Sequence, residues 1–309
     1  MSVRERGRAA LERLIPQSRT ASEDTPQSPW LDRTDWEAGV ERKLASGVLT
    51  LEHAGWCRAF ARDGYLVLEK LIPEDQIDHA WGAYERFYKD HSDEFHQSNL
   101  PEDHWPERYL NTHFSVSEIG EFLHHPRLLE ISELLFGRPT RPFQTITSHK
   151  GTEQGAHSDS IHMTTRPPGY LLAAWIACQD IHSDSGPLVY YPGSHRLPYV
   201  LGRDVEISHE EFSERQNEVY HERYEPRIRE LISEHHLERR EFLAGKGDVL
   251  VWHANLLHGG GFRRDLQRSR KALVCHYFAE GVECFHDLSG HEAAFSGEEG
   301  VAVPPVSQR

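Results

Sequence analysis

The sequence predicts a mainly β fold with flanking helices, in which the strands form a sandwich or a barrel. Beyond residue 140, short segments rich in Val, Ile, Leu, Tyr and Trp alternate with clusters of Gly, Pro, Asp and Ser, as is typical of such folds. Before residue 140, apolar residues recur at helical spacing instead. The strands expected on this basis span residues 143–147, 170–178, 188–191, 249–252 and 271–278.

The N-terminal part is expected to begin with a loosely packed polar extension, residues 1–50, that contains one short helix. Prolines stand there among Ser, Thr, Asp and Glu, and this composition offers little apolar surface for burial. Apolar residues become denser after that point. Residues 60–68 are interpreted as a helix end, a turn and a short strand.

Two further helices are predicted before the strands begin. Residues 74–91 place apolar and aromatic side chains at helical spacing, so one face of this helix should pack on the core. Residues 126–136 form the second helix, because Pro126 suits a first helical turn and Gly137 suits a helix end.

A charged stretch, residues 203–241, separates two of the expected strands. Ser208 and Glu211 have the spacing of a capping box, so this stretch is predicted to be a helical insertion. Residues 51–290 should therefore form a single domain that carries this insertion, followed by a C-terminal tail at 291–309.

Composition narrows the classes of partner and compartment. The chain has 34 Lys and Arg against 49 Asp and Glu, a net charge of −15, which argues against nucleic acid or an anionic membrane as a partner and leaves a small-molecule partner. The four cysteines form no Cys-x-x-Cys pair, and the longest apolar run, 170–178, is too short to span a bilayer. With no apolar signal-peptide core near the N-terminus, the expectation is a reduced, cytoplasmic protein.

The chemistry is expected to lie among the 22 histidines, since imidazole is the commonest ligand of transition metals. A non-haem iron site needs two imidazoles and one carboxylate on one face of the metal. The pattern His-Ser-Asp occurs three times, beginning at His91, His157 and His182. Because chance alone supplies about one His-x-Asp in a chain of this composition, the pattern alone is weak.

The surroundings of the three motifs differ. His91 ends the predicted helix 74–91, and His182 precedes a turn at Gly186, so both motifs suit solvated local structure. His157 instead follows a strand and a loop and precedes the apolar strand 170–178. His157 and Asp159 are therefore the candidate metal ligands.

A second histidine ligand is expected in the segment 247–261, which is interpreted as a turn, a strand and a histidine followed by three glycines. His258 carries these glycines, which would let the backbone approach a ligand closely. His253 is the competitor, but it lies within the strand and lacks the glycines.

Together these segments resemble the phytanoyl-CoA dioxygenase family of Fe(II)- and 2-oxoglutarate-dependent oxygenases over about residues 55–285. The resemblance implies a double-stranded β-helix core of the jelly-roll or cupin kind. It also implies Fe(II), 2-oxoglutarate and O₂ as cofactor and cosubstrates. The matching segments are residues 60–68, 157–159, 186–195, 247–260 and 269–278.

The resemblance assigns His157, Asp159 and His258 as iron ligands. It assigns Arg270 to the distal carboxylate of 2-oxoglutarate, a role that suits a bidentate guanidinium. Arg268 is the alternative, because strand parity places both arginines on one face, although the Arg-Lys-Ala context favours Arg270.

Three further residues are candidates for contact with the cosubstrate. Trp175 matches a family aromatic near 2-oxoglutarate, with a role as a core tryptophan as the alternative. Gln144 and Gln154 are candidates for its other end, with a surface amide as the alternative. Six other histidines have expected roles: two lie close enough to the motif to reach substrate (His162, His113), one should face inward (His276) and three have structural or surface roles (His195, His235, His236).

The implied reaction is hydroxylation of an unactivated C–H bond in a small-molecule metabolite or natural-product intermediate, with release of succinate and CO₂. The intact Asp159 argues against halogenation, because halogenating relatives replace this carboxylate with a small residue. Substrate contacts are expected from residues 111–114, 162–166 and the insertion, which would act as a lid. A non-catalytic β-helix binding protein and a zinc hydrolase are the alternatives, and the oligomeric state is left open.

Overall fold

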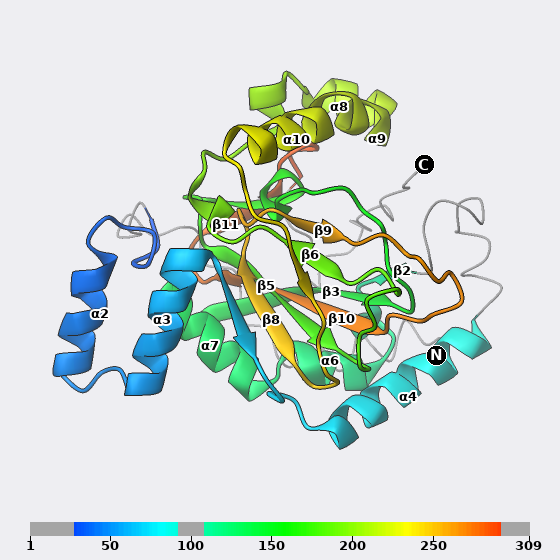
Figure 1. The fold of residues 1–309 in the computed structure, drawn as a ribbon, viewed down its shortest axis with the longest axis horizontal. Helices are drawn as coiled ribbons and strands as arrows, with labels where there is room; N and C mark the ends of the chain where they lie inside the picture. Colours follow the sequence, from blue (N-terminus) through cyan, green and yellow to red (C-terminus); the bar gives the residue numbers. More distant parts are fainter. Residues whose placement is uncertain (1–27, 92–107, 292–309) are drawn as a thin grey trace.

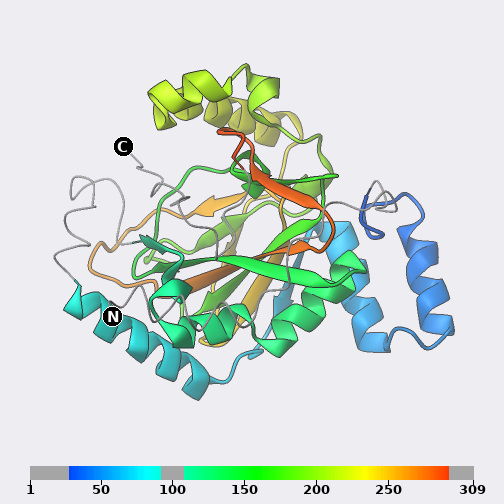
Figure 2. The same ribbon diagram turned by 180° about the vertical axis from the view of Figure 1, so that it is seen from behind.

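The computed structural model describes residues 28–91 and 108–291 of the chain. Helices surround a β core made of a six-stranded and a three-stranded sheet, and two further strands, Glu283–His286 and Met163–Arg166, pair in a small separate sheet (Figures 1 and 2). The helices are α2 (Trp36–Ala45), α3 (Leu51–Asp63), α4 (Glu74–Asp90), α6 (Ser117–Leu123), α7 (Pro126–Phe136), α8 (His209–Arg215), α9 (Asn217–Val219) and α10 (Glu225–Glu234). The strands are β1 (Tyr65–Leu68), β2 (Arg108–Leu110), β3 (Thr140–Ser148), β4 (Met163–Arg166), β5 (Leu171–Ala177), β6 (Leu188–Tyr190), β7 (Arg240–Phe242), β8 (Val249–His253), β9 (His258–Gly260), β10 (Ala272–Ala279) and β11 (Glu283–His286).

The larger sheet has six antiparallel strands in the order β1-β8-β5-β10-β3-β2. Its centre, β5, is buried at every position, because both faces of the sheet are covered. Register places Trp175 opposite Val274, and His276 opposite both Ala173 and Gln144. Directly opposed residues point to the same face, so these five side chains share the inner face of the sheet.

Helices cover the outer face of the larger sheet. Leu172, Ile176 and Leu273 pack there in one core with residues of α3, α4, α6 and α7. Helix α7 begins with Pro126 and ends at Gly137, whose φ of 69° is a left-handed conformation that costs glycine little. The predicted helices 74–91 and 126–136 and the helix–turn–strand at 60–68 are all present.

The smaller sheet, β7-β6-β9, packs against the inner face of the larger one. Leu188, Tyr190 and Phe242 of the smaller sheet share a buried cluster with Trp175 and Trp252 of the larger. All five expected strands are present. Sequence patterns missed β2, β4, β7, β9 and β11, which have three or four residues each and, unlike the equally short β1 and β6, do not stand out as apolar runs.

Residues 28–50 correct one expectation. Loose packing is wrong for this segment, because Leu31, Val40 and Leu49 are buried in the same core as the helices behind the sheet. The indole of Trp30 also donates a hydrogen bond to the carbonyl of Leu134, at 3.1 Å. Isolated apolar side chains in a polar segment can fill gaps between helices. The overall composition of such a segment stays polar and therefore does not reveal them. The one short helix expected here is α2.

The charged stretch between β6 and β7 contains α8, α9, a π-helical turn at Tyr220–Tyr224 and α10. These helices lie together beyond one end of the sheets (Figure 1, top). Ser208 caps α8 by accepting a hydrogen bond from the backbone of Glu211, as its spacing predicted. Within the described residues, no helix is long and apolar enough to cross a membrane. The C-terminal tail, apart from His291, lies outside the described residues.

Candidate metal centre

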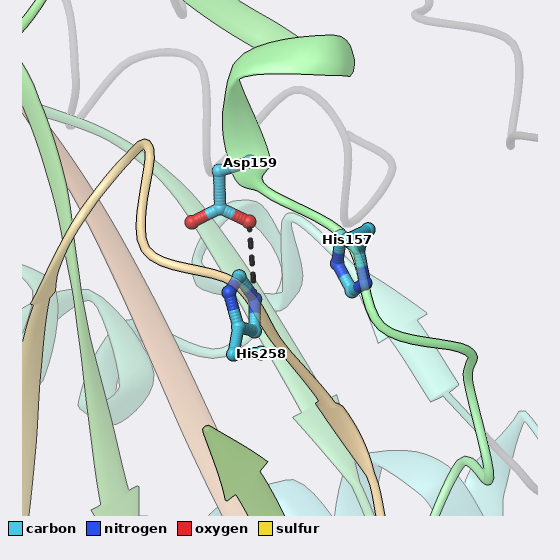
Figure 3. A group of neighbouring side chains, drawn as sticks. All are labelled: His157, Asp159 and His258. Atoms are coloured by element: carbon cyan, nitrogen blue, oxygen red, sulfur yellow. Dashed lines mark ion pairs between the residues drawn. The ribbon is translucent and has the colours of Figure 1, made fainter. Parts of the chain in front are cut away.

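Three predicted ligands meet between the two sheets. His157 and Asp159 lie on the loop that follows β3, and His258 begins β9 of the smaller sheet (Figure 3). One ligand atom from each lies within 4.8 Å of the others, and all three residues are buried. Two imidazoles and one carboxylate in this arrangement match the facial triad of non-haem iron enzymes.

The backbones of the two histidines hold each other in place. The His157 amide donates to the His258 carbonyl at 2.9 Å, and the His258 amide donates to the His157 carbonyl at 2.8 Å. Their ring centroids are consequently 4.5 Å apart. This pairing joins two segments about 100 residues apart in sequence, so the distance between the ligands is set by main-chain hydrogen bonds rather than by flexible side chains.

Each ligand histidine is also oriented through its second ring nitrogen. His157 Nδ1 lies 2.9 Å from the carbonyl of Gly155, and His258 Nδ1 lies 2.9 Å from the carbonyl of Leu256. A carbonyl only accepts, so each Nδ1 carries the proton and each Nε2 presents a lone pair. Burial, followed by the neighbouring His258, lowers the pKa of His157 to about 3. The imidazole is thus neutral at pH 7, as a ligand must be.

The carboxylate of Asp159 is positioned by a tryptophan that sequence reasoning did not single out. Trp252 donates its indole N–H to Asp159 Oδ2 at 2.7 Å, and Asp159 Oδ1 lies 3.4 Å from His258 Nε2. His276 Nε2, which faces inward as expected, is 3.8 Å from Oδ2. Burial would raise the pKa of Asp159, but His258 and His276 outweigh it and hold the pKa below its usual range.

The three glycines after His258 allow close packing of neighbouring backbone, whereas the sequence predicts that they allow a ligand to approach. A Cβ atom on Gly259 would lie 2.7 Å from the carbonyl oxygen of Gln154, and one on Gly260 would lie 2.6 Å from the amide of Glu153. A Cβ on Gly261 would meet the carbonyl of Pro187 at 2.8 Å. The glycines therefore admit neighbouring backbone rather than a ligand, and they allow β9 to lie against the loop that carries His157.

The two candidate arginines are separated by their surroundings. Arg270 is buried, its guanidinium lies over the Trp175 ring at 5.7 Å, and its Nε has no hydrogen-bond partner among the described residues. Arg268 is exposed and pairs with Asp265 at 3.2 Å. Strand parity could not separate them because β10 begins only at Ala272. Of the two, only Arg270 is placed to meet a buried carboxylate.

A second cation on the inner side of the sheet, the half-buried Arg108, was missed by the sequence reasoning. Arg108 begins β2 at the edge of the larger sheet, and its Nη1 lies 3.5 Å from Oε1 of Gln154. Burial lowers its pKa, and Asp159 opposes that shift. Burial, then Arg108 and Arg263, lowers the pKa of Arg270 to about 10. No sequence signal marks Arg108, because it follows a polar stretch and belongs to a strand of three residues.

The two candidate glutamines both lie near the centre. Gln144 is half-buried and faces inward opposite His276, and Gln154 contacts Arg108 as described above. Trp175 is buried beneath Arg270 and also packs edge-on against Phe242, with ring centroids 5.7 Å apart. A core role and a cosubstrate contact are thus compatible for this tryptophan.

The competing histidines lie elsewhere. His253 is buried on the face opposite Trp252, where its Nε2 lies 3.3 Å from Asp32. His195 lies 3.2 Å from the carbonyl of Ala61. His113 lies 2.8 Å from the hydroxyl of Thr145, which faces the helices and not the centre. Of the two expected to reach substrate, only His162 is beside the centre, with its ring 5.6 Å from that of His157.

The other two His-Ser-Asp motifs are local structure where they are described. His91 is the C-terminal cap of α4, and the rest of its motif lies outside the described residues. His182 and Asp184 form an exposed turn in which the backbone of Asp184 donates to His182 Nδ1 at 3.1 Å.

Comparison with known proteins supports this arrangement. The family model for phytanoyl-CoA dioxygenase (PhyH) matches residues 60–272. The peroxisomal phytanoyl-CoA dioxygenase of Mus musculus is 24% identical over 265 residues, covering 80% of this chain and 73% of that protein. Ectoine dioxygenase of Bordetella bronchiseptica is 24% identical over 189 residues, covering 55% of this chain and 60% of that protein.

Solved structures show the same fold. EctD from S. alaskensis with 2-oxoglutarate and 5-hydroxyectoine superimposes with a TM-score of 0.59 at 18% identity, covering 92% of this chain and 99% of that chain. The non-heme alpha-ketoglutarate-dependent carbocyclase SnoK from nogalamycin biosynthesis has a TM-score of 0.59 at 18% identity, covering 79% and 88%. The predicted jelly-roll core is confirmed.

The fold and the His-Asp-His centre define an Fe(II)- and 2-oxoglutarate-dependent dioxygenase with a jelly-roll core. Within that class, the chain belongs to the phytanoyl-CoA dioxygenase (PhyH) family, whose model covers well over half of it. Enzymes of this family use Fe(II), 2-oxoglutarate and O₂, as the sequence predicted.

Proposed function

We propose that this enzyme hydroxylates an unactivated C–H bond of a small-molecule metabolite or natural-product intermediate, releasing succinate and CO₂. The observation that carries the proposal is the buried His157, Asp159 and His258 centre, whose ligand atoms lie within 4.8 Å. Relatives named for phytanoyl-CoA and for ectoine show that the family accepts different small molecules.

The residues present fit a metal of this kind. Both histidines present Nε2, since their Nδ1 atoms are engaged by carbonyls, and Asp159 is held by Trp252. Fe(II) bound there would supply O₂ activation coupled to 2-oxoglutarate decarboxylation. The protein supplies the fixed geometry of the ligands and a buried setting that limits the access of water.

The residues present also fit a dianion. Arg270 is buried and Arg108 half-buried, the charge of Arg108 lowers the pKa of Arg270, and Arg270 Nε has no hydrogen-bond partner among the described residues. Like charges that lie near each other are stabilised when an anion lies beside them. We therefore assign the distal carboxylate of 2-oxoglutarate to Arg270 and its other end to the side on which Arg108, Gln154 and Gln144 lie.

Anaerobic addition of Fe(II) and 2-oxoglutarate tests this proposal. The wild-type enzyme should develop the weak visible charge-transfer band of the chelate and form succinate once O₂ is admitted. His157→Ala should abolish both. His182→Ala, which changes the exposed copy of the same motif, should retain both. Absence of the band in the wild type, or its persistence in His157→Ala, would refute the proposal.

The compartment is proposed from the cysteines. Cys57, Cys178, Cys275 and Cys284 are all buried and unpaired, which suits a reducing compartment. Cytoplasm therefore stays the predicted location.

A further inference from the structure

We propose that the hydroxyl of Tyr220 contacts the substrate, so that the enzyme selects a small organic molecule bearing a hydroxyl or carboxyl oxygen. This inference rests on the proposed function, because it names the substrate class of the same centre. It assigns a specificity-determining role to the helical insertion, whose residues the iron chemistry itself does not require.

Tyr220 begins the π-helical turn Tyr220–Tyr224 between α9 and α10. A π-helical turn has wider hydrogen-bond rings than an α-helix, and such turns are frequent at functional sites. Here it places two tyrosine rings in a stack, with centroids 5.0 Å apart and an interplanar angle of 26°. Both tyrosines are buried, so the turn brings two phenols into the interior from a largely charged segment.

The two phenols differ in what their hydroxyls bind. The Tyr224 hydroxyl accepts a hydrogen bond from the Ser158 amide at 3.0 Å and lies 3.3 Å from the Ser158 hydroxyl. The Tyr220 hydroxyl is buried and has no hydrogen-bond partner among the described residues. Burying a hydroxyl without a partner is unfavourable. Tyr220 is thus the member of the pair that a ligand would satisfy.

Tyr220 is linked to the metal centre through His162. Its ring stacks on His162 at 5.4 Å, and the His162 ring lies 5.6 Å from that of the ligand His157. Burial raises the pKa of Tyr220 well above its usual value, Tyr224, Glu225 and Asp159 add to the rise, and Arg108 opposes it. The phenol is therefore protonated at pH 7, and it shares its surroundings with both the ligand Asp159 and the cation Arg108.

The Tyr220 hydroxyl and the Arg108 guanidinium together indicate which chemical group of the substrate would bind beside them. A protonated phenol donates to an oxygen acceptor, and the nearby Arg108 guanidinium favours an acceptor that is polar or anionic. A purely aliphatic chain in this position would leave the Tyr220 hydroxyl unpaired. The preferred substrate is therefore oxygenated close to the carbon that is oxidised.

The test uses three probes of matched size: benzyl alcohol, benzoate and toluene. Each is titrated into the anaerobic enzyme–Fe(II)–2-oxoglutarate complex, and its dissociation constant is taken from the change in the charge-transfer band. In the wild type, an oxygenated probe should bind at least about five-fold more tightly than toluene, the value for one net hydrogen bond. Tyr220→Phe keeps the ring and should lose this preference while still binding toluene.

Tyr224→Phe is the matched control. Its hydroxyl bonds Ser158, so this variant should melt at a lower temperature and yet keep the preference for oxygenated probes. Equal binding of all three probes by the wild type, no detectable binding of any, or an unchanged preference in Tyr220→Phe would each overturn the inference. Failure of the proposed function is recognised separately, because the band would then be absent before any probe is added.

Discussion

At the scale of single residues, the centre depends on side chains that do not themselves bind the metal. Trp252 donates to the carboxylate of Asp159, and two backbone carbonyls fix the tautomers of the ligand histidines. Outer contacts of this kind orient ligands and raise affinity for the metal. Successive side chains of β8 point to opposite faces of the sheet, so Trp252 faces the centre while His253 faces away from it.

Trp252→Phe should keep the apolar packing of β8 and remove only the hydrogen bond to Asp159. We expect Fe(II) affinity to fall by about 10-fold, as for other losses of an outer contact to a metal ligand. Anaerobic Fe(II) titration of the apo enzyme measures the change. Trp81→Phe is the control, because that indole also donates to a carboxylate, Glu85, but does so on α4. Equal affinity of Trp252→Phe and wild type would contradict the role given to Trp252.

Arg270→Met should weaken 2-oxoglutarate binding by about 10-fold to 100-fold, since it removes a buried hydrogen-bonded charge partner. The dissociation constant for 2-oxoglutarate, followed through the charge-transfer band, reports this. Arg268→Met should bind like the wild type, because Arg268 is exposed and paired with Asp265. A greater loss in Arg268→Met than in Arg270→Met would reverse the assignment.

Arg108→Met tests the second cation. This substitution should weaken 2-oxoglutarate binding. The factor should be smaller than for Arg270→Met, because Arg108 is expected to attract the anion by its charge rather than by a bidentate hydrogen bond. Gln154→Ala removes the 3.5 Å contact that supports Arg108 and should have a weaker effect in the same direction. The same titration measures both variants, and wild-type affinity in Arg108→Met would remove Arg108 from the site.

At the scale of elements, the close approach of β9 to the loop at 153–155 determines whether the ligands meet. The strand has three residues, and its glycines leave no room for a side chain against that loop. The position of His258 relative to His157 therefore depends on the absence of Cβ atoms as well as on backbone hydrogen bonds.

Gly259→Ala should separate β9 from this loop, because its Cβ would lie 2.7 Å from the Gln154 carbonyl. We expect a loss of unfolding free energy of about 1–3 kcal/mol, typical of overpacking, together with weaker Fe(II) binding. Chemical denaturation and Fe(II) titration measure the two effects. Gly55→Ala, in α3 with nothing within 4 Å of the new Cβ, should be neutral or stabilising by up to about 1 kcal/mol. Wild-type behaviour of Gly259→Ala would contradict the packing argument.

At the scale of the whole molecule, buried neutral histidines couple stability to pH. Burial lowers the pKa values of His113 and His195 to about 3, well below the usual value of 6.5. The unfolded chain binds these protons more readily between those values, so stability is lost as pH falls from 6.5 toward 3. Each such histidine contributes about 1.4 kcal/mol per pH unit within that window.

Unfolding free energies measured between pH 7.5 and 5 should decline below pH 6.5. His113→Asn retains a group able to form a hydrogen bond with Thr145. Its unfolding free energy should decline less steeply with falling pH, by about the 1.4 kcal/mol per pH unit that one proton contributes. Denaturant titrations at several pH values, made on the metal-free enzyme, provide the slopes. An unfolding free energy that does not change with pH would contradict this prediction. A pH dependence that is the same in His113→Asn as in the wild type would show that His113 is protonated in the folded state.

The sequence by itself determined the long periodic elements and the β class from local patterns, the jelly-roll class from the family resemblance, and the three candidate ligands from motifs a few residues long. His157, Asp159 and His258 are read from such motifs, and the helix ends at Pro126 and Gly137 follow from backbone chemistry. The tertiary structure alone decided that Arg270 rather than Arg268 is buried, that Arg108 and Trp252 face the centre, and that the Tyr220 hydroxyl has no partner within residues 28–91 and 108–291. The physical reason is that burial and pairing at these positions depend on contacts between segments far apart in the chain, which no local period or spacing encodes.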